Sequence, residues 1–396
     1  LPNCREMNRF TANDILPELK GRVAVFIGAH REFDQQEIDV LDRFCSANDA
    51  VIFCDHTSGF AGKYRINYSL AASQDQMNVR VDRPDITIHI GEITGDYSAT
   101  AIIGNTVWRV SKDGEIRDTF RKLRYVFEMD EKTFFEYYTD PSKAPSTRYL
   151  NQCQERLKEL QQKIPELPFS NIWVAQQIAH KIPRDSAIHF GILSSLRAWN
   201  FFELPDTVTS ASNVGGFGID GGLSSLLGAS LANSNKLYFG IIGDLAFFYD
   251  MNALGNRHAG KNLRIMVVNN GKGAEFRRYN QHGALLGEQA DEFICAAGHF
   301  GNKSSTLIQH YAQDLGFEYI SAKNKKDFEK TCQKFLSKEV FDKSIIYEIF
   351  TDGLEESKAL EIIRNIMIDP GFITKKNIRK LIGEKGVKIL KKIIKN

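Results

Sequence analysis

Short apolar runs, each ended by glycine or polar residues, recur along the first third of the chain. The first is Arg22-Val-Ala-Val-Phe-Ile-Gly28, and residues 34–46 after it show the spacing of an amphipathic helix. The apolar pattern repeats at residues 51–54, 86–90 and 105–110. Such runs are typical of strands that are buried on both faces of a sheet, so the pattern predicts βαβ units with parallel strands.

A second series of strands and helices follows a linker-like stretch, Asp140-Pro-Ser-Lys-Ala-Pro-Ser-Thr147. We predict strands at residues 187–191, 236–242, 263–268 and 345–350. We predict helices at residues 148–163, 171–182, 220–233, 246–260, 304–316 and 325–337. The alternation predicts the α/β fold class, with two consecutive three-layer domains whose parallel sheets have helices on both faces.

The predicted domain organisation has five parts. They are a linker remnant (1–20), a central α/β domain (21–140), a linker (141–147), a second α/β domain (148–352) and a helical C-terminal extension (353–396). The extension ends in residues 375–396, a basic segment with interleaved apolar residues. A basic amphipathic helix can lie on an anionic membrane, but Gly383 and Gly386 weaken a long helix. We therefore favour a helical tail that docks its apolar face on the protein.

Composition narrows the function classes only slightly. The chain has 396 residues, of which 42% are hydrophobic and 25% are charged, and its formal net charge is +2. This charge gives no reason to expect a nucleic-acid partner, and no apolar run has the length of a membrane span. The six cysteines lack metal-ligand spacing. We therefore expect reduced, buried thiols and a cytoplasmic protein.

Polar residues follow two neighbouring strands of the predicted second domain. Gly243-Asp244 comes directly after one strand, and Asn269-Asn270 ends the next. Because parallel strands end at the same edge of a sheet, a carboxylate and two carboxamides should lie side by side there. These hard oxygen ligands suit Mg²⁺, which commonly completes its shell with phosphate and water. A generic nucleotide-binding α/β protein could place the same residues at its strand ends.

The spacing of these residues resembles the signature of the thiamine-diphosphate (ThDP) enzymes. That signature is Gly-Asp-Gly at the end of one strand and Asn-Asn at the end of the next. The match here is Gly243-Asp244-Leu245 with Asn269-Asn270, so Leu245 replaces the last glycine of the first motif. The resemblance implies that the cofactor is ThDP held through Mg²⁺, with Ca²⁺ or Mn²⁺ as substitutes.

One branch of this family is similar over a longer stretch. Asn213-Val-Gly-Gly-Phe-Gly-Ile-Asp-Gly221 and Val267-Val-Asn-Asn-Gly-Lys-Gly273 resemble segments of the menaquinone-pathway synthases (MenD-like), which join 2-oxoglutarate to isochorismate. Asp55-His-Thr-Ser-Gly59 resembles a segment of their central domain. The resemblance covers about residues 20–350.

This resemblance implies roles for individual residues. Asp244 and Asn270 would bind Mg²⁺ through their side chains, and Lys272 would bind it through its backbone carbonyl. Ile219 would force the cofactor into a bent conformation, although an isoleucine is more often plain core. The helix that opens near residues 221–225 could hold the diphosphate at its N-terminus. The implied cofactor contacts are Gly218, Ile219, Asp220, Gly221, Gly243, Asp244, Leu245, Asn270, Lys272 and Gly273.

Two departures from the family pattern limit the expected activity. The family has an N-terminal pyrimidine-binding domain with a glutamate that helps to activate the cofactor. We expect that domain to come from a segment ahead of Leu1 or from another chain, and we expect this chain alone to be inactive. Val214 and Trp199 replace the arginines that bind substrate carboxylates in the branch, which predicts weak binding of a dicarboxylate. Arg197 could replace them, but on a helix we expect it to point elsewhere.

The catalytic residues are unknown from the sequence, and three candidates stand out. Ser195 matches a substrate-side serine of the branch, whereas His282 and His299 lie in the loop-rich segment after the Asn-Asn motif. The same segment contains the charged residues Glu275, Arg277 and Arg278. These residues could contact the substrate, but an exposed turn would explain them equally well.

The leading functional hypothesis is the C-terminal portion of a ThDP-dependent transferase or lyase. It would decarboxylate a 2-oxo acid and transfer the acyl group to a small acceptor. The alternatives are a non-catalytic or split-enzyme ThDP-binding subunit and the menaquinone-pathway reaction itself. A nucleotide-binding first domain is a weaker alternative, because Gly28-Ala-His-Arg-Glu32 lacks the glycines of a dinucleotide site, and no FAD is expected. The family also implies a homodimer or a homotetramer.

Overall fold

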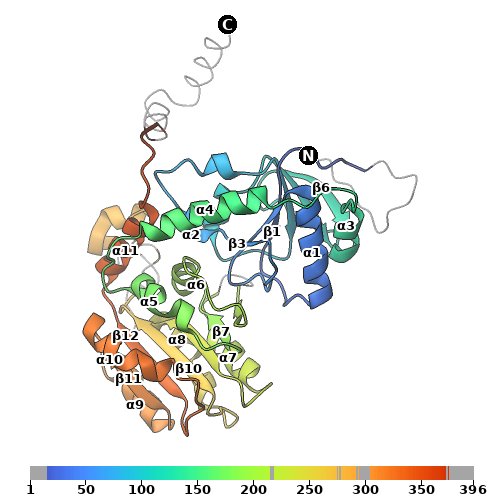
Figure 1. Ribbon diagram of the computed structural model, residues 1–396. Coiled ribbons are helices and arrows are strands. Elements are labelled where there is room, and N and C mark those ends of the chain that lie inside the picture. The colour runs from blue at the N-terminus through green and yellow to red at the C-terminus, as the bar shows by residue number, and fades with distance from the viewer. Residues whose placement is uncertain are drawn as a thin grey trace.

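Two parallel sheets organise the computed structural model, which describes residues 16–214, 218–273, 275, 278–290, 293, 304–371 and 373. Each sheet has six strands, and every strand pair in the described residues is parallel (Figure 1). This confirms the predicted α/β fold class. The predicted basic tail at residues 375–396 lies outside the described residues. No helix in the part that the structure describes is long and apolar enough to span a membrane.

The first sheet has the strand order β3-β2-β1-β4-β5-β6. Its strands are β1 (Val23–Ile27), β2 (Val51–Cys54), β3 (Arg65–Asn67), β4 (Ile86–Ile90), β5 (Thr106–Ser111) and β6 (Leu123–Glu128). Its helices are α1 (Gln35–Asn48), α2 (Ser69–Ala72) and α3 (Glu131–Tyr137), with 3₁₀ helices at Val79–Asp82 and Tyr97–Ala101. Every residue of β1, β2 and β4 is buried, as their apolar runs predicted.

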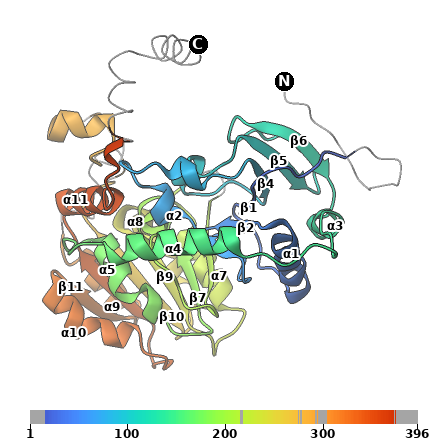
Figure 2. The same cartoon turned by 45° about the horizontal axis from the view of Figure 1, so that its top comes forward.

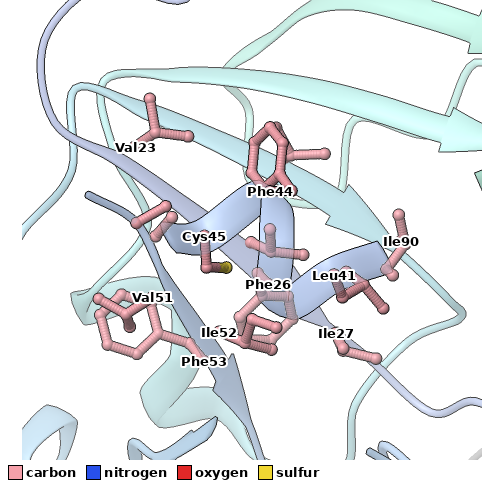
Figure 3. Packing of buried hydrophobic residues seen from close by; sticks show 14 of the residues in the cluster. Val23, Phe26, Ile27, Leu41, Phe44, Cys45, Val51, Ile52, Phe53 and Ile90 are labelled. Atoms are coloured by element: carbon pink, nitrogen blue, oxygen red, sulfur yellow. The ribbon is translucent and has the colours of Figure 1, made fainter. Parts of the chain in front are cut away.

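Helix α1 packs on the first sheet through its apolar face. Asp34 and Glu37 form a capping box that fixes the start of the helix. Figure 3 shows Leu41, Phe44 and Cys45 of α1 packed with the side chains of β1 and β2. Burial raises the pKa of the Cys45 thiol well above its ordinary value. The described cysteines are all free and buried, which confirms this expectation for Cys45, Cys54, Cys153 and Cys332.

The second sheet has the strand order β11-β12-β10-β9-β7-β8. Its strands are β7 (Ala187–Phe190), β8 (Thr209–Ser212), β9 (Tyr238–Gly243), β10 (Leu263–Asn269), β11 (Glu318–Ala322) and β12 (Ile345–Phe350). Its α-helices are α5 (Asn171–Ile178), α6 (Ser194–Trp199), α7 (Gly222–Ser230), α8 (Asp244–Asp250), α9 (Leu307–Asp314), α10 (Lys325–Phe335) and α11 (Gly353–Arg364). Helix α4 (Arg148–Gln162) comes before them and packs mainly on the first sheet. Its 3₁₀ helices are Ala179–Lys181, Met251–Gly255 and His282–Ala290.

Helices cover both faces of the second sheet, as predicted. Residues of α5, α10 and α11 form one hydrophobic cluster with the sheet, and residues of α7, α8 and α9 form another. Ile345 and Ile346 of β12 belong to opposite clusters, because successive side chains of a strand point to opposite faces. Two helical layers therefore bury both faces of the sheet. A ligand can still bind at the carboxyl ends of its strands.

The predicted elements differ from the structure in several respects, and helices α2 and α3 are among the elements that were not predicted. Strands β3, β6, β8 and β11 were not predicted, and these are the two edges of each sheet. An edge strand is partly exposed, so it lacks the continuous apolar run that marks a central strand. The predicted helix at 246–260 is wrong in length, because α8 ends at Asp250 and a 3₁₀ helix, Met251–Gly255, follows. Asn and Gly are poor helix formers, and they are frequent in this stretch.

The two sheets are joined by α4 and by the loop after β2. In Figures 1 and 2, α4 (green) lies across the boundary between them, and its Tyr149 and Leu160 belong to the clusters of different sheets. His56 Nε2 lies 2.9 Å from the carbonyl oxygen of Phe202, and Asn200 Oδ1 accepts the His56 backbone N–H. The segment that resembles a family motif thus docks the first sheet on the second.

Candidate functional site

The carboxyl ends of β9 and β10 place polar residues side by side. The two strands pair in parallel, with Val268 opposite Gly243. Asp244 and Asn270 therefore leave the sheet at the same edge, as the sequence predicted. Asp244 is also the first residue of α8, where the helix dipole favours a negative charge.

The Asp244 carboxylate connects the two strand ends. It is 2% exposed, and its Oδ2 accepts the backbone N–H of Gly271 at 2.8 Å, while Oδ1 accepts that of Leu245 at 2.9 Å. Gly271 has a φ of 76°, which favours glycine. Asn270 Oδ1 accepts the Lys272 N–H at 3.2 Å. An ionised carboxylate has further lone pairs, so Asp244 can bind a cation while it keeps these bonds.

Glu348 is a buried residue near this edge that the sequence analysis missed. Its Oε1 accepts the Asn269 side-chain N–H at 2.6 Å, and its Oε2 accepts the Tyr319 hydroxyl at 2.8 Å. Burial raises the pKa of Glu348, and the nearby charge of Asp244 adds to the effect. Asn269 Oδ1 in turn accepts the Gly271 N–H. Glu348 thus orients the turn after β10. Its position inside an otherwise apolar strand is the sequence feature that could have identified it.

A cavity of about 300 Å³ opens at this edge of the sheet. Among the implied cofactor contacts, those that line it are Ile219, Gly243, Asp244, Leu245, Asn270, Lys272 and Gly273. Those that do not line it are Gly218, Asp220 and Gly221. A Cβ atom at Gly243 would meet no other atom within 4 Å, so a ligand can approach the backbone of this strand end.

The N-terminus of α7, the expected diphosphate site, already has an acidic partner. Asp250 Oδ2 accepts the backbone N–H of Ser224 at 2.7 Å, and Asp250 Oδ1 accepts its hydroxyl at 2.6 Å. This carboxylate satisfies one of the free N–H groups of the first turn. In this conformation an anion at α7 would have to compete with Asp250.

The three catalytic candidates have different positions. Ser195 is 2% exposed and lines the cavity. His282 is exposed at the start of a 3₁₀ helix and does not line the cavity. His299 lies outside the described residues. Of the two candidates that the structure describes, only Ser195 lines the cavity.

We expected Arg197 to point away from the site because of its position on a helix. The structure shows that this expectation is wrong. Arg197 lines the cavity, and its Nη1 forms an ion pair with Glu275 at 2.5 Å. Helix α6 has only six residues and starts directly beyond the carboxyl edge of the sheet. Ser194 and Arg197 are three residues apart, so they share the face of α6 that borders the cavity. The prediction considered the helix alone and missed its place in the sheet.

Glu275 and Arg278 do not lie on an exposed turn. Their side chains are 19% and 16% exposed, they line the cavity, and Arg278 Nη2 lies 3.1 Å from Glu275 Oε2. Burial lowers the pKa of Arg278, and the charge of Glu275 opposes this shift. Arg277 lies outside the described residues. The structure therefore rules out an exposed turn as the explanation for Glu275 and Arg278.

Trp199 and Val214, which stand where the resemblance implies arginines, are buried. Trp199 has no exposed surface, and its indole N–H donates to Asn171 Oδ1 at 3.1 Å. Val214 is 8% exposed and belongs to the same hydrophobic cluster. Neither side chain offers a charged donor to a carboxylate.

The donor set at the strand ends fits Mg²⁺ bound together with a diphosphate. No cluster of three or more His, Cys, Asp or Glu residues suited to a metal occurs among the described residues. Asp244, Asn270 and the Lys272 carbonyl instead offer three hard oxygen atoms, and Mg²⁺ usually takes its remaining ligands from phosphate and water. The site therefore suits a metal that arrives with its anion better than a free metal ion.

Comparison with known proteins identifies relatives of this chain. The 2-succinyl-5-enolpyruvyl-6-hydroxy-3-cyclohexene-1-carboxylate synthase of Bacteroides fragilis is 34% identical over 255 residues, which cover 64% of this chain and 44% of that protein. The chain is a relative of these synthases. The synthase of the same name from Phocaeicola vulgatus is 34% identical over 253 residues, which cover 64% of this chain and 43% of that protein.

A third relative of the same name, from Christiangramia forsetii, is 33% identical over 186 residues, which cover 47% of this chain and 30% of that protein. The comparisons confirm the resemblance that the motifs indicated. No protein-family model matches the chain. The chain spans about half the length of the curated relatives it matches, since the longest of these three matches covers 44% of the relative.

Proposed function

We propose that this chain provides the metal- and diphosphate-binding half of a ThDP-dependent enzyme that forms carbon–carbon bonds. The reaction would be decarboxylation of a 2-oxo acid and transfer of the acyl group to an acceptor. The observation that supports it most is the pair of strand ends at Asp244 and Asn270, which face one cavity. The relatives, which are named as synthases, point to the same class of reaction.

In this proposal the residues of the chain hold and orient the cofactor. Asp244 and Asn270 would bind Mg²⁺ through side-chain oxygens, and Lys272 through its carbonyl. ThDP would supply the stabilisation of a carbanion, which amino-acid side chains lack. Ile219 would support the bent cofactor, and apolar side chains at the cavity would exclude water. A pyrimidine-binding domain with its glutamate would come from elsewhere in the polypeptide or from another chain, in a homodimer or homotetramer.

Titration calorimetry with ThDP tests the proposal. We expect binding in the presence of Mg²⁺ and none when EDTA removes the metal, because the diphosphate reaches Asp244 only through the cation. Thiamine without its diphosphate is the matched control and should not bind measurably. Absence of Mg²⁺-dependent binding, even with a pyrimidine-binding domain from a relative added, would contradict the proposal.

A non-catalytic ThDP-binding subunit is the second candidate. Asp250 occupies the N–H of Ser224 that a diphosphate would otherwise use, which favours a degenerate site that binds the cofactor weakly. Product formation from a 2-oxo acid and an aldehyde acceptor, measured with the added pyrimidine-binding domain, distinguishes the two. The menaquinone-pathway reaction is a less favoured candidate, because Trp199 and Val214 are buried and uncharged.

Replacing Glu348 with Leu should weaken Mg²⁺-dependent ThDP binding about 10-fold, because groups that orient metal ligands typically contribute 10–100-fold. The change removes the acceptor of the Asn269 amide and so loosens the turn that carries Asn270. Glu348→Gln is the matched control, since a glutamine oxygen can still accept from Asn269. Calorimetry at saturating Mg²⁺ measures both, and equal affinities of the two variants would contradict the role.

A further inference from the structure

One side of helix α11 borders the cavity. The residues of α11 that line it are Gly353, Glu356, Ser357 and Leu360. Their spacing of three or four residues places them on one side of the helix. Figures 1 and 2 show α11 beside α5, and Asn171 and Ile172 at the start of α5 line the same cavity. Glu356 therefore lies where the first turns of two helices meet the cavity.

The hydrogen bond of Glu356 orients its carboxyl group and tolerates a proton. Its Oε1 accepts the backbone N–H of Asn171 at 2.8 Å. Asn171 is the first residue of α5, so this bond satisfies an N–H that has no partner within the helix. A protonated carboxyl group can keep the bond through one oxygen while the other oxygen carries the proton.

The two glutamates that line the cavity have opposite surroundings. Glu275 lies between Arg197 and Arg278, and both of its oxygens take part in ion pairs. Burial instead raises the pKa of Glu356, and the charge of Asp352 adds to the rise, whereas the bond from α5 and the charge of Arg278 oppose it. Surroundings that separate two acids in this way are typical of sites where one acid donates a proton.

The other titratable groups of the cavity are less suited to donate a proton. Asp244 and the backbone of Lys272 are proposed metal ligands, and Tyr249 is 62% exposed. The guanidinium groups of Arg197 and Arg278 do not release protons in the ordinary pH range. Glu356 is therefore the best candidate for a proton donor in this cavity.

We infer that Glu356 is a catalytic acid that contacts the acceptor in the cavity and donates one proton to it as the acyl group is transferred. This inference rests on the proposed function, because it adds a residue to the same reaction. A neutral acceptor that forms a bond to a nucleophilic acyl carbon gains one negative charge. One proton must therefore reach the product, and solvent returns a proton to the Glu356 carboxylate afterwards. Positioned acids typically contribute about 10²–10⁴-fold to the rate of such steps.

Infrared titration of the chain without cofactor tests for the proton itself. The unaltered chain should keep the carboxylic-acid band of Glu356 above the ordinary glutamate value of pH 4.5, and Glu356→Gln should lack this band. The glutamine oxygen can still accept the Asn171 N–H, so the start of α5 keeps its partner. Glu355→Gln is the matched control and should keep the band, because Glu355 precedes Glu356 on α11 and does not line the cavity.

A single-turnover experiment tests the role of this proton. The chain is loaded with Mg²⁺ and ThDP and combined with a pyrimidine-binding domain from a relative, and CO₂ release and product formation from pyruvate and an aldehyde are measured separately. Glu356→Gln should slow product formation about 100-fold and leave CO₂ release and ThDP affinity unaltered, because the acid acts in the transfer step. Product formation by the unaltered complex should fall as the pH rises through the pKa of Glu356, and the variant should lack this dependence. Glu355→Gln should behave as the unaltered complex.

The outcomes separate this inference from the proposed function. Equal product formation by the Glu356→Gln and Glu355→Gln complexes, both with ThDP bound, would overturn the inference alone, as would identical infrared titrations of the two variants. Failure of the unaltered chain to bind ThDP would overturn the proposed function and the catalytic role with it. If Glu356→Gln does not fold, Glu356→Asp decides, because it moves the acid by one methylene group. The pH dependence of product formation should then shift, and an unaltered dependence would contradict the role.

Discussion

Replacing Asp244 with Asn should abolish measurable Mg²⁺-dependent ThDP binding. The substitution keeps an oxygen that can accept the Gly271 N–H, but it removes the one carboxylate among the proposed metal ligands. Groups that merely orient a metal ligand are worth about 10–100-fold in affinity, so loss of the ligand itself should exceed that range. Calorimetry with ThDP at a fixed, saturating Mg²⁺ concentration measures the effect.

The matched control for this variant is Asp342→Asn, a carboxylate that is fully exposed in its ion pair with Lys261. We expect its ThDP affinity to equal that of the unaltered chain. The melting temperature of Asp244→Asn without cofactor shows whether its fold is intact. A folded Asp244→Asn chain that binds ThDP as well as the control would remove Asp244 from the metal site.

Replacing His89 with Phe should remove a large part of the acid sensitivity of the fold. His89 lies in β4, is 2% exposed and packs against the rings of Phe26 and Phe120. Burial, aided by the charge of Arg109, lowers the pKa of His89 from 6.5 to about 3. The unfolded chain therefore binds a proton below pH 6.5 that the folded chain does not bind, so acid favours unfolding.

The sign and the size of this effect can be measured. Stability from the neutral ring is complete above pH 6.5 and is lost as the pH falls toward 3, by about 1.4 kcal/mol for each pH unit. Urea unfolding at a series of pH values from 7.5 downward should show this slope in the difference between the unaltered chain and His89→Phe. Parallel stability curves for His89→Phe and the unaltered chain would show that His89 does not titrate in this way.

The central strands could be predicted from the sequence because burial on both faces demands continuous apolar residues. The runs at Val23–Ile27 and Ile86–Ile90 fulfil this demand, and both are fully buried. The edge strands could not be predicted in the same way. Thr209–Ser212 contains only small and polar residues, and it becomes a strand because β7 offers its free backbone groups.

The candidate site likewise contains some residues whose positions the sequence predicts and others whose positions it does not. Asp244 and Asn270 follow predictable strands, so their adjacency could be predicted from parallel topology alone. The direction of Arg197 could not, because it depends on Gly95 and Tyr97, which are distant in the sequence. Glu348 acts on the site through Asn269, a contact between strands that no local pattern encodes.

The sequence by itself determined the α/β class, the central strands and the pair of strand ends at Asp244 and Asn270. These follow from local periodicity and from the rule that parallel strands end at one edge. Only the tertiary structure decided that Trp199 is core, that Arg197 faces the cavity and that Glu275 lies between two arginines. Burial and ion pairing depend on which distant segments meet, and that information is distributed over both sheets.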